Sequence, residues 1–250
     1  MKRNWLLTLT IATAMAMVGF AIAAVTPASA ISTNIVIGEF RTRGPAGGND
    51  EFIELYNLSS VPVNISGWRI NGSSSTGVTT TRATIPNGVT LGAYQHYLMA
   101  NTAASGYSGS ATPNLTYTTG IVDNGGIAIV DTTNVIIDQV GMSATSAYRE
   151  GTTLTQTTTS IQQSYARQPN TLSQVGGYKN GVDTDSNIAD FIYNNGSSSP
   201  ENLTSPLAII LSDLSASTPA ASPAPVVFGA LGLVAAALLL RRQAARTTSN

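Results

Sequence analysis

The stretch from Asn49 to Ile70 decides the fold and reads N-D-E-F-I-E-L-Y-N-L-S-S-V-P-V-N-I-S-G-W-R-I. Apolar and polar residues alternate through 51–56 and again through 61–65, a pattern typical of strands that bury one face and expose the other. Residues 57–60 lie between them, and their Asn and Ser side chains favour a turn by bonding their own backbone. The stretch therefore predicts a β-hairpin, whose second strand lies at an edge because Pro62 cannot donate a ladder hydrogen bond.

Similar patterns predict strands through most of the middle of the chain. The expected strands are Ile35–Phe40, Glu51–Tyr56, Val61–Ile65, Trp68–Asn71, Thr84–Leu91, His96–Asn101, Gly126–Val130 and Val135–Val140. Asp131–Asn134 is a turn between the last two, whereas the Ser-, Thr- and Gly-rich stretches Gly72–Arg82 and Thr102–Gly120 are expected to be mobile surface loops. Regularly spaced strands, without a sustained helical period before the C-terminal end, predict an all-β sandwich.

The N-terminal end has the parts of a secretory signal peptide. Two basic residues precede an apolar run from Trp5 to Val25, and Ala28–Ala30 has the small-x-small form of a signal-peptidase site. Residues 1–30 are therefore expected to form a signal helix that is cleaved between Ala30 and Ile31. The length of the apolar run leaves an uncleaved membrane anchor as the alternative.

The C-terminal end predicts the membrane as a partner. Residues 207–225 are typical of a flexible Ser/Ala/Pro spacer, and the apolar run 226–240 is followed by the basic tail 241–250. As a helix, the run rises only about 22 Å, which is short of a hydrocarbon core of about 30 Å. Snorkelling arginines can extend this short transmembrane helix, and basic residues after it favour an extracellular position for residues 31–206.

The charge of the part between the two ends argues against nucleic acid as a partner. All thirteen carboxylates lie between Glu39 and Asp213 with seven of the twelve basic residues, which gives this part a net charge of −6. Nucleic-acid binding normally needs a basic surface, because phosphate neutralisation supplies most of the non-specific affinity. The chain has no cysteine and one histidine, so disulfides, lipid attachment through cysteine and an ordinary zinc site are excluded.

Four oxygen-bearing side chains suggest a weak calcium site. Asp183, Asp185 and Asn187 occupy alternate positions, and Asp190 follows three residues later. Alternating oxygen ligands are the way in which a calcium loop wraps its ion, but the Gly and Glu that complete such a loop are missing here. The alternative is an Asx-rich turn before a short strand. No other cofactor is expected.

Three glutamates on neighbouring strands do not predict catalysis. Glu51 and Glu54 should point to opposite sheet faces, because three residues is an odd spacing. Glu39 is expected to form an ion pair with Arg41 or Arg69 on the exposed face. A glycosidase-like pair would need two carboxyls at a defined separation and a raised pKa on one of them.

Tyrosines offer a possible ligand face. Tyr94, Tyr97, Tyr107 and Tyr117 are the candidates, since two of them fall in the expected loops. His96 lies beside this set and is expected to decorate a strand face, because no nucleophile motif accompanies it. The residues therefore predict neither an enzyme nor a small-molecule substrate.

Six segments together resemble the lamin tail domain, an immunoglobulin-like β-sandwich. These segments are I-V-I-G-E-F (Ile35–Phe40), D-E-F-I-E-L-Y-N (Asp50–Asn57), I-S-G-W-R-I (Ile65–Ile70), I-P-N-G-V-T-L (Ile85–Leu91), D-N-G-G-I-A-I-V (Asp123–Val130) and V-I-I-D-Q-V (Val135–Val140). The resemblance implies an all-β scaffold without catalytic machinery, and 160–167 and 183–191 resemble the end of bacterial versions. Some animal relatives contact DNA, a role that does not carry over to an acidic, exported chain.

The C-terminal end resembles a bacterial sorting tail of the PEP-CTERM kind, with Ala224 in place of the usual Glu between prolines. A retained anchor and a transient sorting signal both remain open. The expected function is that of an exported, surface-anchored, non-catalytic module for adhesion, envelope or matrix assembly, or ligand display. Its partner would be a surface protein or polysaccharide. The alternatives are a carbohydrate-binding or nuclease-associated accessory module and a purely structural matrix component.

Overall fold

The computed structural model describes residues 32, 34–169, 181 and 183–206. The expected signal peptide and cleavage site, the spacer, the apolar helix and the basic tail lie outside the described residues. The strands are β1 (Ile35–Arg41), β2 (Phe52–Asn57), β3 (Val63–Asn64), β4 (Arg69–Ser73), β5 (Thr79–Thr84), β6 (Thr90–Leu91), β7 (His96–Asn101), β8 (Leu115–Tyr117), β9 (Gly126–Val130), β10 (Ile136–Gly141), β11 (Gln163–Arg167) and β12 (Phe191–Asn195). A four-residue helix, α2 (Asn187–Asp190), directly precedes β12.

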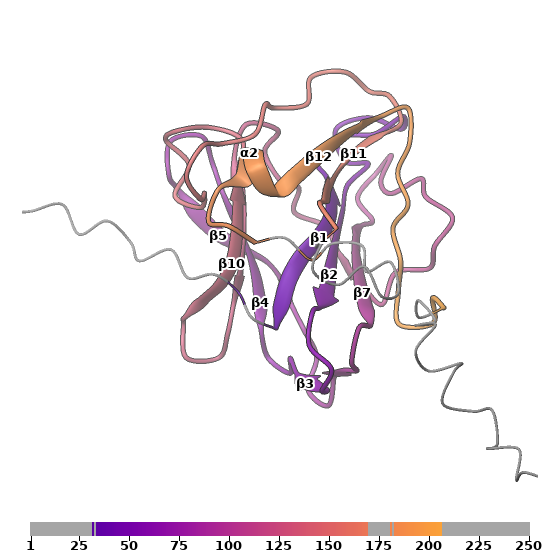
Figure 1. The fold of residues 1–250 in the computed structure, drawn as a ribbon. Coiled ribbons are helices and arrows are strands. Elements are labelled where there is room, and N and C mark those ends of the chain that lie inside the picture. The colour runs from indigo at the N-terminus through magenta and orange to yellow at the C-terminus, as the bar shows by residue number, and fades with distance from the viewer. Residues whose placement is uncertain (1–31, 33, 170–180, 182, 207–250) are drawn as a thin grey trace, which may run out of the picture. The chain divides into compact units, whose positions relative to one another are not determined.

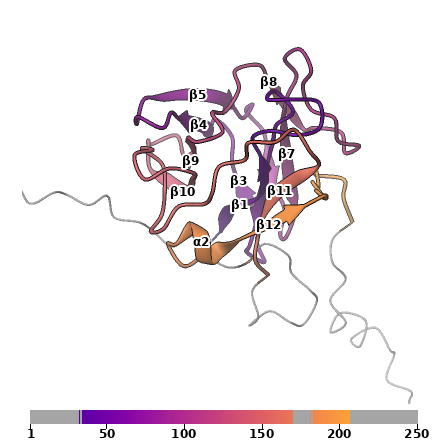
Figure 2. The same cartoon turned by 90° about the horizontal axis from the view of Figure 1, so that it is seen from above.

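The strands form two main sheets that face each other. One has the order β12-β11-β1-β2-β7-β8, the other has the order β10-β9-β4-β5, and β3 and β6 form a separate pair. The described pairs are antiparallel except β7 with β8. Figures 1 and 2 show β4, β5 and β10 on one side of the molecule and β1, β7 and β11 on the other. The expected all-β sandwich is confirmed over the described residues.

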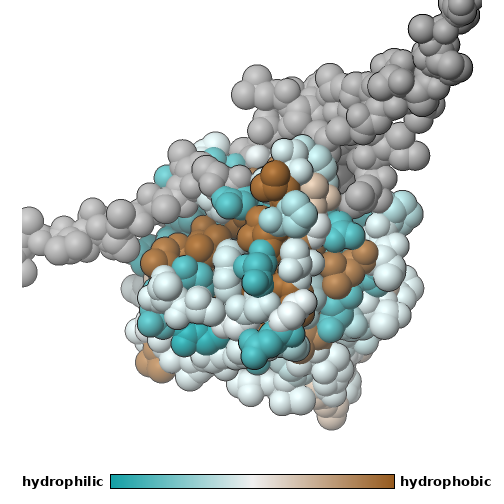
Figure 3. Space-filling view, turned by 90° about the horizontal axis from the view of Figure 1, so that it is seen from below, coloured by the Kyte–Doolittle hydropathy of each residue, from teal (hydrophilic) through white to brown (hydrophobic). Residues whose placement is uncertain are grey.

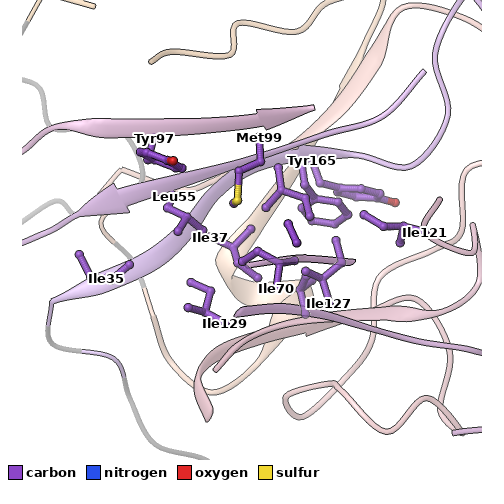
Figure 4. Packing of buried hydrophobic residues seen from close by; sticks show 14 of the residues in the cluster. Ile35, Ile37, Leu55, Ile70, Tyr97, Met99, Ile121, Ile127, Ile129 and Tyr165 are labelled. Atoms are coloured by element: carbon purple, nitrogen blue, oxygen red, sulfur yellow. The ribbon is translucent and has the colours of Figure 1, made fainter. Parts of the chain in front are cut away.

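Alternating apolar residues from both sheets meet in one core. Ile37, Leu55 and Met99 point from the six-stranded sheet toward Ile70 and Ile129 of the four-stranded sheet (Figure 4). These side chains are fully buried, and burying each one contributes about 1.5–3 kcal/mol. The expected period-two pattern is therefore correct for the inner faces. On the face of the molecule shown in Figure 3, the exposed apolar side chains form small separate groups between polar ones.

The β-hairpin expected within residues 49–70 is wrong. β2 pairs with β1 and β7 instead, and β3 pairs with β6 in the small sheet. Pro62 precedes β3 and cannot donate a backbone hydrogen bond, which keeps this segment out of a central position. β2 occupies the centre, and its residues are buried on both faces.

The outer face of the six-stranded sheet is covered rather than exposed. Phe52, Leu98 and Ala100 form a second apolar cluster there, and Tyr107 packs on it from the segment after β7. The rings of Phe52 and Tyr107 make an edge contact with centroids 5.9 Å apart. The expected mobile loop 102–120 is therefore anchored, and it also contributes β8.

The other expected loop, 72–82, is also partly a strand. β5 pairs along the whole of β4, which lies between β5 and β9. The first three residues of β5 are exposed threonines, and β-branched threonine suits an edge strand with one solvated face. The β-propensity of these threonines therefore favours a strand here, although the segment lacks the alternating apolar residues by which the other strands were predicted. The turn at 131–134, in contrast, connects β9 and β10 as expected.

Asn57 fixes the exit from β2 and provides a test of the fold. Its buried side-chain amide donates to the carbonyls of Val61, Leu91 and Gly92 at 2.9–3.1 Å, and its oxygen accepts from the Ser59 N–H. Asn57→Ala should lower the free energy of unfolding by about 3 kcal/mol, because several buried polar groups lose their partner. Urea denaturation measures this loss.

A matched control is available in Asn64, which is exposed and caps a turn by accepting from the Ser66 N–H. Asn64→Ala should cost about 1 kcal/mol or less. Equal losses in the two variants would contradict the role assigned to Asn57.

Candidate functional site

A groove opens at the β12 edge of the six-stranded sheet. β11 and β12 pair in register so that Tyr165 lies directly opposite Tyr193, and their ring centroids are 5.2 Å apart at an angle of 48°. Residues 155–159 run across the same face, where the Tyr165 hydroxyl donates to the Thr155 carbonyl at 2.6 Å. The space between encloses about 410 Å³ and is called the β11–β12 groove.

The groove has an aromatic floor and a hydroxyl-rich wall. Its lining consists of segment 155–159, Gln163, Tyr165, Ile188, Phe191 and Tyr193. None of these residues is charged. Tyr193 and Ile188 are 42% and 52% exposed, so the opening combines accessible apolar surface with threonine and glutamine side chains. Such a lining can hold a neutral ligand by contact and hydrogen bonding.

Hydrogen bonds hold the walls of the groove in place. The Tyr193 hydroxyl donates to Gln163 Oε1 at 2.6 Å, and Gln163 Nε2 donates to the Thr159 carbonyl at 2.6 Å. The Thr157 hydroxyl bonds the hydroxyl of Thr42, next to β1, at 2.8 Å. The groove is therefore formed before any ligand arrives, which reduces the entropy that binding would cost.

The expected tyrosine face does not exist as one surface. Tyr97 and Tyr117 are 2% and 4% exposed and belong to the main core, where burial raises the pKa of both hydroxyls. Tyr107 packs on Phe52, and burial raises its pKa to about 12. Tyr94 is half-buried and has a φ of 57°. The sequence analysis favoured tyrosines in expected loops, and it therefore missed Tyr165 and Tyr193, the two tyrosines that line the groove.

A buried histidine links the sheet to the segment after β12. His96 Nδ1 lies 2.7 Å from Glu54 Oε1, and its Nε2 lies 3.1 Å from Glu201 Oε2. His96 lies on a face of strand β7, as expected, but it is only 7% exposed because the segment after β12 covers it. Burial raises the pKa of Glu54 to about 7. β2 and β7 bring Glu54 and His96 together through the register Tyr56–His96, which no local sequence pattern reveals.

The segment after β12 also binds Glu39, which lies on the same sheet face as Glu54. Glu39 accepts hydrogen bonds from the backbone and hydroxyl of Ser199 at 3.0 and 3.2 Å, and Glu54 accepts from the Glu201 N–H at 2.6 Å. Glu39 is 3% exposed, so the expected ion pair with Arg41 or Arg69 on a wet face is wrong. Arg41 pairs instead with the buried Asp50.

Glu51 sits away from these groups, as its odd spacing from Glu54 predicted. It accepts hydrogen bonds from the Asn101 side chain at 3.0 Å and from the Ile121 N–H at 2.9 Å. Burial raises its pKa to about 7 although these donors act in the opposite direction. Glu39, Glu51 and Glu54 are thus built into the packing of the sheet.

Two of the four residues proposed for calcium, Asp183 and Asp190, lie beside Arg167 of β11. Arg167 Nη1 lies 3.6 Å from carboxylate oxygens of both Asp183 and Asp190. Asn187 turns its oxygen to the N–H groups of Gly141 and Glu150, each at 2.9 Å. Asp183 and Asp190 also accept backbone hydrogen bonds from their own segment, which is the arrangement of the alternative Asx-rich turn. Asp185 has a φ of 57°.

Two groups of side chains in the described part of the chain have the closeness that a metal site needs. One is Glu54, His96 and Glu201, and the other is Asp138, Glu150 and Asp183. Of the four predicted calcium ligands, the second group contains only Asp183. Calcium binding stays a prediction.

Comparison with known proteins concerns the same sandwich. Residues 28–144 match the family model described as Lamin Tail Domain, which covers the strands from β1 to β10. No curated protein matches the chain. The matched range contains most of the apolar core, and the groove residues of β11 and β12 lie beyond it. This chain is therefore similar to the lamin tail domain over residues 28–144, a range that contains the strands β1 to β10 and thus most of the two facing sheets.

Proposed function

We propose that this chain is an exported, non-catalytic β-sandwich module that is held at the cell surface and presents a ligand-binding face. Adhesion, or assembly of the envelope or matrix, would be its work, with a surface protein or polysaccharide as partner. The observation that carries the proposal is the β11–β12 groove, which is open, pre-formed and free of charged side chains. A groove without acids, bases or nucleophiles other than hydroxyls suits binding better than catalysis.

The placement of the titratable groups supports a non-catalytic role. Glu54 and His96 both contact Glu201 in the segment after β12, and Arg167 is fully buried among aspartates. Such contacts stabilise the packing of the sandwich. The lamin tail domain family is, in addition, a non-catalytic one.

Attachment to the membrane rests on the sequence of the two ends. Within the described residues, no helix has the length and hydrophobicity that a bilayer crossing requires. The apolar run 226–240, with its arginines, is the segment proposed to hold the protein at the membrane. This placement would leave the sandwich and its groove outside the cell.

Fractionation of producing cells tests the proposal. The full chain should be found in the membrane or cell-surface fraction, with Ile31 as its first residue by mass spectrometry, and external protease should degrade it in intact cells. A matched variant that ends at residue 225 should appear in the medium. Recovery of the full chain from the cytosol with Met1 in place would contradict the proposal.

A further inference from the structure

We propose that the β11–β12 groove binds a neutral saccharide. The inference rests on the proposed function of ligand display and names the class of the ligand. It follows from the charge, the hydrogen-bonding groups, the aromatic surface and the size of the groove.

The lack of charged side chains in the lining disfavours strongly ionic ligands. An anion would need an arginine, a lysine or a set of free backbone N–H groups, and a cation would need carboxylates. The ten lining residues include no arginine, lysine, aspartate or glutamate, so the groove has no side chain that would pair with an ionic ligand. The chain as a whole is acidic outside its two ends, which further disfavours polyanions.

The wall of the groove offers many uncharged donors and acceptors. Thr155, Gln156, Thr158 and Thr159 are exposed, and within the described residues their side chains make no hydrogen bond. Each hydroxyl both donates and accepts, and the amide does the same through two different atoms. A ligand with several hydroxyls, each with this same dual character, matches such a wall.

The floor supplies the contact that the apolar face of a sugar ring needs. Tyr193 is 42% exposed, and its ring orientation is fixed by the bond from its hydroxyl to Gln163. Tyr165 meets it at 48° and is 7% exposed, so a single ring is accessible for stacking. A proline-rich peptide usually docks on several accessible rings in a row. One open ring with a hydroxyl wall favours a saccharide.

The volume of the groove sets the size of the bound part. About 410 Å³ lies near the lower end of the range for ligand pockets, which runs from about 300 to 1,000 Å³. The groove is open to solvent, so it would hold one or two sugar units of a longer chain and leave the rest in water.

Binding of the purified full chain in detergent to defined oligosaccharides tests the proposal. The probes are oligomers of neutral hexoses and of N-acetylated hexosamines, with hexuronic-acid oligomers as the charged comparison, and calorimetry measures the affinity. We expect saturable binding of at least one neutral series and affinity at least about tenfold lower for the charged series. Tyr193→Ala should weaken binding by at least about tenfold, which corresponds to about 1.4 kcal/mol, because it removes the aromatic anchor.

Ile192 provides a matched control. It directly precedes Tyr193 in β12 and is 46% exposed. Because successive side chains of a strand alternate, it points to the opposite face of the sheet. Ile192→Ala should leave saccharide affinity within about twofold, and thermal melting should show that both variants fold. Tyr193→Phe, which keeps the ring, should retain most of the binding.

Several outcomes would overturn the inference. The first two are no binding of any neutral saccharide and an equal loss of saccharide affinity in Tyr193→Ala and Ile192→Ala. The other two are tighter binding of the uronic-acid series and displacement of the saccharide by a proline-rich peptide. A chain that reaches the cell surface but binds no saccharide would remove this inference and leave the proposed function standing. Cytosolic retention would remove the proposed function whatever the calorimetry shows.

Discussion

Arg167→Met is expected to destabilise the protein by about 4 kcal/mol, because it leaves buried carboxylates without their cation. The Arg167 side chain is fully buried. Its Nη2 donates to Asp138 at 2.6 Å, its Nε donates to the Ile37 carbonyl at 2.9 Å, and its guanidinium lies 4.6 Å from the Phe191 ring centre. Chemical denaturation monitored by circular dichroism would measure the loss.

The size of the effect follows from where Arg167 lies. It belongs to β11, whereas Asp138 belongs to β10 of the opposite sheet and also accepts the Ile37 N–H of β1 at 2.6 Å. One guanidinium thus ties both sheets and the segment that holds Asp183 and Asp190. Marginal domains have about 5–15 kcal/mol of stability, so a loss of this size removes a large share.

Two further variants test the explanation. Arg149 is exposed and donates to the Ser146 carbonyl, so Arg149→Met should change stability by about 0.5 kcal/mol or less. Adding Asp138→Asn to Arg167→Met should recover part of the loss, since it removes one of the unpaired charges. A loss below about 1 kcal/mol in Arg167→Met would show that the buried pair does not hold the sheets together.

The free energy of unfolding is expected to fall by at least about 3 kcal/mol between pH 5 and pH 8. Burial raises the pKa of Glu51 and of Glu54 from 4.5 to about 7. Between these two values the folded protein binds protons that the unfolded chain has released, so its stability declines as the pH rises through this window. For one carboxyl, such a change in pKa corresponds to about 3 kcal/mol.

Two more buried carboxyls act in the same direction. Burial raises the pKa of Asp138 to about 6 and that of Glu150 to about 9, and Glu150 extends the decline toward alkaline pH. Urea titrations at pH 5, 6, 7 and 8 measure the slope. Glu54→Gln should flatten it, and the double variant with Glu51→Gln should flatten it further. Constant or rising stability over this range in the unaltered chain would contradict the prediction.

Several strand positions were predictable because alternation is a local property, but the expected strand Thr84–Leu91 is wrong, since β5 ends at Thr84 and β6 contains only Thr90 and Leu91. The strands at 96–101 and 126–130 have the bounds that the sequence predicts. Partners were not predictable in the same way. The opening stretch suggested a hairpin because a turn separates two alternating segments, yet Asn57 bonds Leu91 and Gly92 and directs the chain away from β2.

The candidate site was largely hidden from the sequence. Tyr165 and Tyr193 become neighbours only through the β11–β12 register, and the Thr-rich segment 155–159 has the composition of an ordinary loop. A Thr and Gln run just before an aromatic strand is the one local signal that pointed there. The choice of Tyr97 and Tyr117 failed because both belong to strands whose described residues pack into the core.

The all-β architecture could be determined from the sequence alone, because the apolar period of each strand requires only its own residues. The tertiary structure alone decided which strands pair, which carboxylates lose their water and where a groove remains open. These features depend on contacts between residues distant in the chain, such as Arg167 with Asp138 or Glu54 with His96. Their energies arise from burial, and burial exists only once the sheets have closed on each other.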